Sequence, residues 1–334
     1  MKTLKTRGLT RVAALSATLA LTVAGCASET STADSTTDGP VSGLRFLVPN
    51  APGSGYDSTA RAAVKAMEEA SIIDGAEVFN LAGAGGTVGL QRVVNEKGNA
   101  KLVMQMGLGV VGAAYTNKSK ATLAETTPIA KLIEEPEAIA VPKDSPFTTL
   151  AEFVAAWKAD PGKTPVGGGS SPGGPDHLAP MLTAEAVGVS PKEVNFVSYD
   201  GGGELLAALL GSKIKAAFTG TGEVEEQAAA GQLRILAVTS AERIEGIDAP
   251  TLKESGYDLT FTNWRGLVAP GDISAADTKQ LTDAVVKMHA SEQWKTTLAD
   301  KGWTDAFLVG DDYAAFLTAE DTRVRDILST LGLA

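Results

Sequence analysis

Strand-like and helix-like segments alternate along most of this 334-residue chain. Short apolar runs are each followed by a longer stretch with apolar residues at helical spacing. The predicted strands are 44–48, 76–80, 101–106, 129–133, 138–141, 195–197, 216–219 and 235–239. The predicted helices are 58–70, 87–95, 149–159, 176–186, 203–210, 223–230, 275–290 and 312–331. This alternation predicts an α/β fold in which mixed, mostly parallel sheets carry helices on both faces.

The 36 glycines gather where a predicted strand gives way to a helix. Five clusters occur, at 52–57, 83–87, 167–174, 200–203 and 219–222. A glycine turn leaves backbone N–H groups unpaired, and the next helix adds its own free amides and the positive end of its dipole. Such loops bind anions, and in open parallel sheets they meet at the carboxyl ends of the strands. The glycines could also simply permit tight turns, but five clusters together favour a carboxylate site.

The first 25 residues have the pattern of a bacterial lipoprotein signal peptide. Four basic residues and no acid accompany the apolar run 12–23, which is too short to span a bilayer as a helix. Val23-Ala24-Gly25-Cys26 then places the single cysteine where a lipobox has its lipidated thiol. The alternative is an ordinary signal peptide with an unrelated cysteine. Residues 26–42, rich in Ser, Thr, Asp and Gly, predict a flexible tether.

The charge and the reactive residues exclude several functions. Because the signal peptide carries four bases and no acid, its removal takes the net charge from -11 to -15, which argues against a nucleic-acid partner. With one cysteine, no intrachain disulfide can form. Two histidines give no clustered metal site, and no phosphate-binding G-x-x-x-x-G-K-[ST] occurs, so we expect neither metal nor cofactor. The acidic run of Glu134, Glu135 and Glu137 is typical of a solvated surface.

One motif suggests an enzyme. Residues 169–173 match G-x-S-x-G, the nucleophile elbow of serine hydrolases, with Ser171 as the nucleophile. Only His177 and His289 could act as its base. His289 lies in a predicted helix, and His177 follows Ser171 by only six residues, an unusual separation for a triad. A surface serine hydrolase is therefore kept as an alternative, and we expect no enzyme.

Four segments resemble the substrate-binding receptors of tripartite tricarboxylate transporters. They are LVPNAPGSGYD at 47–57 with the following Ala60-Arg61, the loop 167–178, YDGGG at 199–203 with 207–211, and NWRGLVAP at 263–270. The likeness runs from about Leu44 to the C-terminus. It implies a two-lobed periplasmic-binding-protein fold of type II with the ligand cleft between the lobes. With crossovers in 134–141 and 260–269, lobe 1 comprises 43–137 and 262–334, and lobe 2 comprises 138–261.

The resemblance also implies a binding mode. In that family two loops, here 52–57 and 170–174, hold a ligand carboxylate through backbone groups and bridging waters. Two positions depart from the family: Asp200 stands where a basic residue is common, and Arg265 where an aromatic residue is usual. We expect Arg265 either to contact a second carboxylate or to line the hinge. The candidate ligand-binding residues are Pro52, Gly53, Ser54, Gly55, Tyr56, Asp57, Gly85, Gly86, Thr87, Gly169, Ser170, Ser171, Gly173, Gly174, His177, Tyr199, Gly202, Thr219 and Gly220.

The function implied by the resemblance is that of an extracytoplasmic solute receptor. From the pattern of the signal peptide we expect a lipid on Cys26 to hold it at the outer face of the cell membrane. We expect a monomer that captures a small carboxylate, such as a di- or tricarboxylate, in its cleft. The closed receptor would deliver this ligand to the subunits of a tripartite tricarboxylate-type membrane permease. A ligand-binding sensor without transport is a further alternative that the sequence leaves open.

Overall fold

The computed structural model describes residues 40–199 and 201–334. The predicted signal peptide, Cys26 and nearly all of the predicted tether lie outside these residues, as does Asp200. The first strand, β1, begins at Val41, so residues 41 and 42 belong to the fold and not to the tether that we placed at 26–42. They join the sheet because Val41 pairs with Ile73 of the neighbouring strand.

Strands and helices follow one another as the sequence predicts. The first part of the chain contains β1 (Val41–Val48), α1 (Gly55–Glu69), β2 (Ile73–Asn80), α2 (Thr87–Asn95), β3 (Leu102–Gly107), α3 (Leu108–Thr116) and β4 (Thr126–Pro142). The middle part contains α4 (Leu150–Ala159), β5 (Val166–Gly168), α5 (Pro175–Val187), β6 (Phe196–Ser198), α6 (Gly202–Leu210), β7 (Ala216–Gly220), α7 (Thr221–Ala229) and β8 (Leu233–Val238). The last part contains β9 (Thr262–Pro270), α8 (Ala275–Ala290), α9 (Glu292–Lys301), β10 (Thr304–Val309) and α10 (Gly310–Leu331). Helices α3 and α9 and strands β5 and β10 were not predicted.

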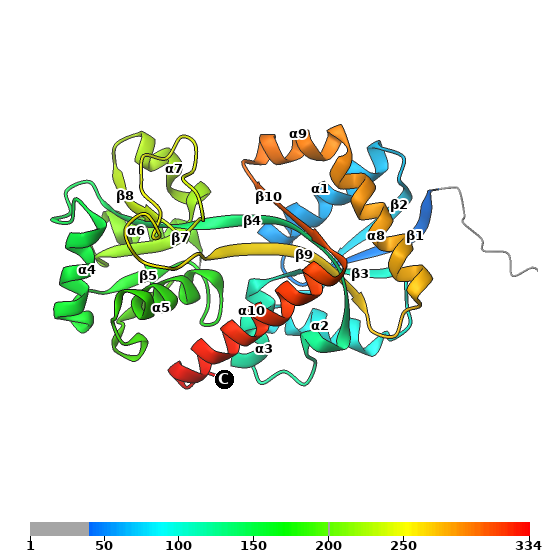
Figure 1. Ribbon diagram of the computed structural model, residues 1–334, viewed down its shortest axis with the longest axis horizontal. Helices are drawn as coiled ribbons and strands as arrows, with labels where there is room; N and C mark the ends of the chain where they lie inside the picture. Colours follow the sequence, from blue (N-terminus) through cyan, green and yellow to red (C-terminus); the bar gives the residue numbers. More distant parts are fainter. Residues whose placement is uncertain (1–39, 200) are drawn as a thin grey trace, which may run out of the picture. The chain divides into compact units, whose positions relative to one another are not determined.

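Two groups of parallel strands are joined by two antiparallel strands (Figure 1). β2, β1 and β3 form one parallel group, and β6, β5 and β7 form the other. Between them, β9 pairs antiparallel with β3 and β4, and β4 pairs antiparallel with β7, β8 and β10. We call β2-β1-β3-β9-β4 with β10 the first half-sheet, and β4-β7-β5-β6 with β8 the second half-sheet.

Strand β4 belongs to both half-sheets. Its residues 126–136 pair with β9, and its residues 137–142 pair with β7 and β8. The two predicted strands 129–133 and 138–141 are therefore parts of one 17-residue strand. The predicted α/β fold with mixed sheets is confirmed. Parallel pairing is confined to the outer strands, because β4 and β9 carry the chain between the half-sheets and pair antiparallel with their neighbours.

Helices cover both faces of the first half-sheet (Figure 1). On one face α1, α8 and α9 enclose an apolar cluster that includes Phe46, Met67 and Trp294. On the other face, a second cluster extends from Tyr313 of α10 to Trp157 of α4, which packs on Phe218 of the second half-sheet. Burial of this apolar surface is the main stabilising contribution to such a fold, and the second cluster spans the strands that join the half-sheets.

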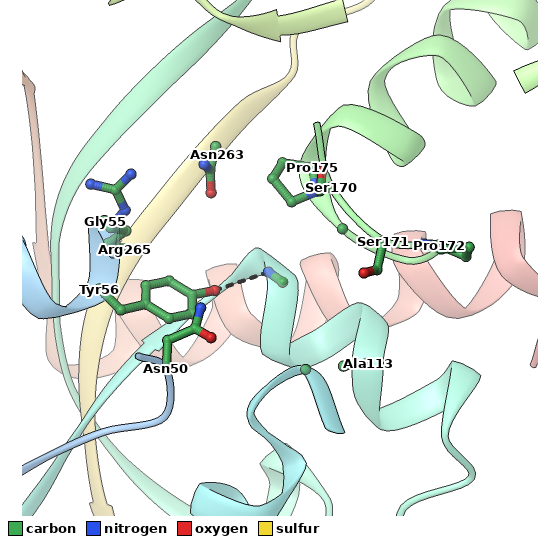
Figure 2. A pocket seen from close by; sticks show the side chains of 13 residues that line it. Asn50, Gly55, Tyr56, Ala113, Ser170, Ser171, Pro172, Pro175, Asn263 and Arg265 are labelled. Atoms are coloured by element: carbon green, nitrogen blue, oxygen red, sulfur yellow. Dashed lines mark hydrogen bonds between the residues drawn. The ribbon is translucent and has the colours of Figure 1, made fainter. Parts of the chain in front are cut away.

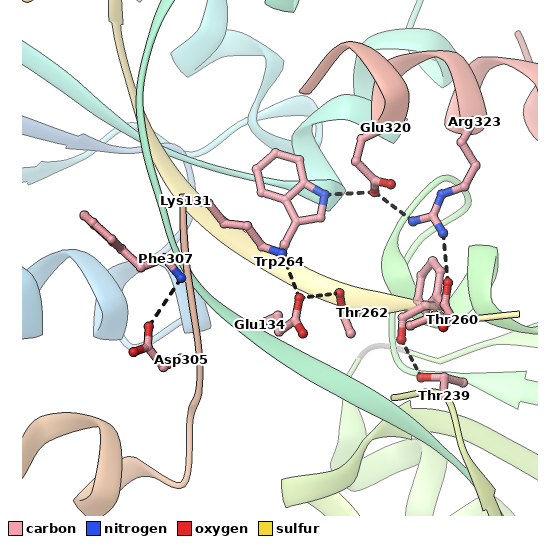
Figure 3. A network of polar contacts seen from close by, with 11 residues as sticks. Lys131, Glu134, Thr239, Thr260, Thr262, Trp264, Asp305, Phe307, Glu320 and Arg323 are labelled. Carbon is pink, nitrogen blue, oxygen red and sulfur yellow. Dashed lines mark hydrogen bonds and ion pairs between the residues drawn. The ribbon is translucent and has the colours of Figure 1, made fainter. Parts of the chain in front are cut away.

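A buried polar network fixes α10 against β9 (Figure 3). Glu320 is 7% exposed and accepts hydrogen bonds from Trp264 Nε1 at 3.0 Å and Arg323 Nη2 at 2.7 Å. Arg323 also donates to the backbone oxygen of Thr260 at 3.3 Å and lies over the ring of Phe261. One carboxylate thus links the last helix to the segment that enters β9.

Candidate functional site

The carboxyl ends of the parallel strands in the two half-sheets border a cavity of about 300 Å³ (Figure 2). One wall consists of the loop after β1 and the first turns of α1 and α3, and the other is the loop from β5 to α5. The lining residues are Asn50, Gly55, Tyr56, Gly85, Gly109, Ala113, Ser170, Ser171, Pro172, Gly174, Pro175, Asn263 and Arg265. The glycine clusters 52–57, 83–87 and 167–174 contribute to these walls, whereas the described residues of 200–203 and 219–222 do not.

Tyr56 places a hydroxyl group beside the cavity. It lies in the first turn of α1, and its Oη accepts the backbone N–H of Gly109, in the first turn of α3, at 3.1 Å (Figure 2). Burial raises the pKa of Tyr56 to about 12, although the nearby Arg265 acts in the opposite direction. The phenol is therefore neutral near pH 7, and its O–H can donate a hydrogen bond to an anion.

Arg265 of β9 brings a cationic side chain to the same wall. Its Nη1 donates to the Thr59 hydroxyl at 3.2 Å, and its Nη2 forms an ion pair with Glu135 of β4. The guanidinium lies against Gly55, where an added Cβ would come within 2.6 Å of Nη2. The first residue of α1 is therefore a glycine because Arg265 occupies the space that a side chain would fill.

Asp57 shapes the loop after β1 and does not line the cavity. Its carboxylate accepts hydrogen bonds from Gly53 N–H, Arg61 Nε and Asn80 Nδ2, each at 2.9 Å. Burial favours the neutral acid, but these donors outweigh burial and lower the pKa of Asp57. Asp57 and Arg61 thus form an ion pair at the (i, i+4) spacing of a helix. The helix predicted at 58–70 begins three residues earlier than predicted, at Gly55, and Ser54 caps it by accepting the Asp57 N–H.

Side chains of α5 hold the loop that follows β5. Asp176 accepts the N–H of Gly169 at 2.8 Å, and its own N–H donates to Ser170 Oγ at 2.9 Å. His177 Nδ1 accepts the N–H of Gly173 at 3.2 Å. Burial raises the pKa of Asp176 to about 6, although its hydrogen bonds with Ser170 and Gly169 lower the pKa. The loop backbone therefore keeps its shape through hydrogen bonds to the helix behind it.

The two walls touch at a pair of glycines. Gly112 of α3 packs so closely on Gly173 that a Cβ on Gly112 would overlap the Gly173 carbonyl oxygen. Gly173 has a φ of 89°, a left-handed conformation that glycine adopts without steric cost. Ala113, the next residue of α3, lines the cavity. The contact therefore joins an element of the first half-sheet to a loop of the second at the edge of the cavity.

His177 is expected to make the fold sensitive to acid. The side chain is buried, and burial lowers the pKa of His177 from 6.5 to about 4. Between these values the unfolded chain binds a proton that the folded chain does not bind, so the free energy of unfolding falls as the pH drops through this window, by about 3 kcal/mol in total. His177→Asn keeps an acceptor for the Gly173 N–H without a titrating group. Urea unfolding at pH 7.5 and 4.5 should show a smaller acid loss in the variant, and an equal loss in both proteins would contradict this assignment.

The contacts of Ser171 do not form a catalytic triad. Ser171 is exposed, and in the part of the chain that the structure describes no hydrogen bond joins its hydroxyl to a histidine. His177 uses Nδ1 for the Gly173 N–H, while His289 Nε2 pairs with Asp305 at 2.9 Å and its ring stacks on Phe307. A serine nucleophile needs a base within hydrogen-bond reach. The G-x-S-x-G motif is therefore present without the geometry that it needs.

The predicted ligand-binding residues divide into two groups. Those that line the cavity are Gly55, Tyr56, Gly85, Ser170, Ser171 and Gly174. Those outside its wall are Pro52, Gly53, Ser54, Asp57, Gly86, Thr87, Gly169, Gly173, His177, Tyr199, Gly202, Thr219 and Gly220. Several of the second group have local structural roles: Thr219 donates to Glu223 at 2.8 Å, and Thr87 donates to the Ala84 carbonyl at 3.0 Å.

Other wall residues were not among the candidate ligand-binding residues, although Pro172 lies in the predicted binding loop 170–174. They are Asn50, Gly109, Ala113, Pro172, Pro175 and Asn263. Asn50 lies just after β1 and Pro175 begins α5, so the rule that ligands bind beyond the carboxyl ends of strands could have found both. Gly109 and Ala113 belong to α3, which the sequence did not predict. Asn263 is two residues before Arg265 and shares its face of β9.

The acidic run that we expected on a solvated surface lies where the half-sheets join. Glu134 pairs with Lys131 at 2.7 Å, Glu135 pairs with Arg265, and Glu137 is fully buried. Among the described residues neither carboxyl oxygen of Glu137 has a hydrogen-bond partner, and burial raises its pKa well above the usual value. The expectation was wrong because β4 turns successive residues to opposite faces, and both faces are covered here. Within 40–199 and 201–334, no group of three or more His, Cys, Asp or Glu residues is placed to hold a metal ion.

Comparison with known proteins assigns this arrangement to one family. Residues 59–333 match the tripartite tricarboxylate transporter family receptor. The UPF0065 protein of the TAR-I ttuE-ttuC' intergenic region of Agrobacterium vitis is 29% identical over 265 residues, which cover 78% of this chain and 72% of that protein. A TctC solute-binding protein from Polaromonas is 28% identical, with a TM-score of 0.75 over 87% of this chain and 99% of that one. MatC from Rhodopseudomonas palustris with bound malate shares the fold at 24% identity, with a TM-score of 0.67 over 86% of this chain and 99% of that one.

These matches confirm the resemblance seen in the sequence motifs. From residue 59 onward the family match covers strands of both half-sheets and the strands that join them; β1 and the start of α1 precede it. Both structural neighbours share the predicted fold, and the Polaromonas protein is a solute-binding protein. The chain belongs to the tripartite tricarboxylate transporter receptor family of solute-binding proteins.

Proposed function

We propose that the cavity binds the carboxylate of a small organic acid, which the chain delivers to a tripartite tricarboxylate-type permease. The observation that carries the proposal is a pair of helix N-termini on opposite walls: α1 begins at Gly55 and α5 at Pro175, and both residues line the cavity. The positive dipole ends of the two helices favour an anion between them. At the start of α5 the dipole acts without free N–H groups, because Pro175 has none and the Asp176 N–H donates to Ser170 Oγ. Tyr56 adds a neutral O–H donor on one wall, and Ser170 and Ser171 add hydroxyl groups on the other.

The size of the cavity agrees with a small ligand. A volume of about 300 Å³ is at the lower end of the range for small-molecule sites. Malate bound to the Rhodopseudomonas palustris protein is consistent with a carboxylic acid as a ligand for this fold. A receptor of this kind needs no catalytic group, and we propose that the chain binds its ligand without transforming it.

We further propose that the half-sheets act as two lobes. Lobe 1 would comprise residues 43–137 and 262–334, lobe 2 residues 138–261, and the hinge would lie in β4 and β9. Closure of lobes around a ligand is the usual motion of such receptors. The contact of Gly112 with Gly173, one residue from each lobe, supports a state in which the lobes are closed at the edge of the cavity.

The family implies a location outside the cytoplasm. We propose that a lipid on Cys26 holds the receptor at the outer face of the cell membrane, because the cysteine follows Val23-Ala24-Gly25 at the end of a signal-like segment. A tether up to about residue 40 would leave the cleft free to meet the permease. The described helices include none long and apolar enough to cross a membrane.

A thermal-shift screen tests the proposed function. The protein would be heated with a series of small organic acids and with the primary amide of each acid as a matched neutral control. An acid present at 100 times its Kd should stabilise the folded protein by about 2.7 kcal/mol. The amide should give a much smaller shift because it lacks the anion that the helix N-termini favour. No shift with any carboxylic acid, or equal shifts with acid and amide, would contradict the proposal.

A further inference from the structure

The charge of Arg265 is already balanced before any ligand enters. Among the described residues that line the cavity, Arg265 is the only one with a charged side chain. Its Nη2 is ion-paired with Glu135, and Nη1 donates to the Thr59 hydroxyl. The wall therefore presents a guanidinium group to the ligand, but no net positive charge from this pair.

Strand pairing builds this ion pair into the fold. Glu135 of β4 lies opposite Asn263 of β9, and Arg265 is two residues further along β9 on the same face. The Arg265 side chain is only 9% exposed, and that of Glu135 is 29% exposed. Gly55, the first residue of α1, packs directly against the guanidinium. The guanidinium is therefore enclosed beside Glu135.

The neighbouring charges add no further attraction for an anion. Arg61 is paired with Asp57, and Lys131 is paired with Glu134. The buried acids Glu137 and Asp176 lie behind the walls and add no positive charge. The first turn of α3 also borders the cavity, but its Gly109 N–H already donates to Tyr56 Oη. The N-termini of α1 and α5 remain for an anion, and their partial charges of about +0.5 each together match a single carboxylate.

We propose, resting on the proposed function, that Glu135 makes the cleft selective for acids with one carboxylate and a neutral polar group at the other end. The carboxylate lies between the N-termini of α1 and α5. A guanidinium has five N–H donors, and those that Arg265 does not use for Thr59 and Glu135 can donate to a hydroxyl or carbonyl oxygen of the ligand. A second carboxylate at this position would face Glu135 without a cation of its own.

The test compares a dicarboxylate with its half-amide. Binding of succinate and succinamate to the full-length protein would be measured by titration calorimetry at pH 7.5. The wild type should bind succinamate at least tenfold more tightly. In Glu135→Gln the guanidinium is no longer neutralised, so the preference should reverse, with succinate gaining at least tenfold over the wild type.

Glu134→Gln is the matched control. It makes the same change of charge at the next residue of β4, where the side chain pairs with Lys131 on the opposite face and is 27% exposed. It should leave the ratio of the two affinities unchanged. Equal effects of both substitutions, or tighter binding of succinate than of succinamate by the wild type, would overturn the inference. The wild-type comparison stands even where a variant does not fold. Absence of binding by every carboxylate would instead overturn the proposed function, and the inference with it.

Discussion

Gly112→Ala is expected to weaken ligand binding by about 5- to 150-fold while leaving the unliganded protein folded. The added Cβ would overlap the carbonyl oxygen of Gly173, which belongs to the opposite wall of the cavity. An overpacked contact of this kind costs about 1–3 kcal/mol, and here the cost applies only when the walls meet. Because the ligand must then close the walls against this cost, its apparent Kd rises by the corresponding factor.

Gly203→Ala is the matched control for that experiment. Gly203 lies in α6, where an added Cβ meets no atom within 4 Å. Alanine should be neutral or slightly stabilising there, because glycine is the weaker helix former. Calorimetric titration of the acid found in the screen, together with thermal unfolding, would compare the variants. If Gly112→Ala binds the acid as tightly as Gly203→Ala does, the Gly112 contact is not part of the liganded state.

Glu320→Ala is expected to lower the free energy of unfolding by about 3 kcal/mol. Removing one partner of a buried ion pair leaves the other without compensation, and here the indole N–H of Trp264 also loses its acceptor. The effect is large because the carboxylate joins α10 to β9, so both elements lose a fixed contact. Urea unfolding monitored by circular dichroism gives the change from the shift in midpoint.

Asp326→Ala provides the comparison on the same helix. Asp326 pairs with Arg325, and their side chains are 65% and 49% exposed. Exposed pairs contribute about 0–1 kcal/mol, so this variant should unfold close to the wild type. A loss in Glu320→Ala no larger than in Asp326→Ala would show that the network in Figure 3 does not hold α10 in place.

The sequence predicted those elements that a pattern of neighbouring residues identifies. The helices at 87–95 and 275–290 were predicted with their observed bounds, because each has a periodic apolar face and a clear start after glycine or serine. The glycine clusters after β1, β2 and β5 correctly indicated loops that meet at one cavity. These features depend on neighbouring residues along the chain, which the sequence displays directly.

Features that depend on tertiary packing were missed. Helix α3 has the sequence LGVVGAAYT, which is apolar on all sides and contains two glycines, so no periodic face distinguishes it from a strand or a loop. Its glycines are explained only by the close approach of Tyr56 and Gly173. The pairing of Arg265 with Glu135 joins residues 130 positions apart and follows from the β4–β9 register, which no local pattern reveals.

The position of a bound carboxylate would show whether the cavity between the half-sheets is the ligand site. Crystals of the protein grown with the acid from the screen would locate that group by diffraction. We expect a carboxylate between the N-termini of α1 and α5, within hydrogen-bond reach of Tyr56 Oη on one wall and of the 170–174 loop on the other. A second cavity of about 420 Å³ lies elsewhere, with Lys143 and Arg234 in its lining. An acid bound there, with the cavity at Tyr56 filled only by water, would contradict the account.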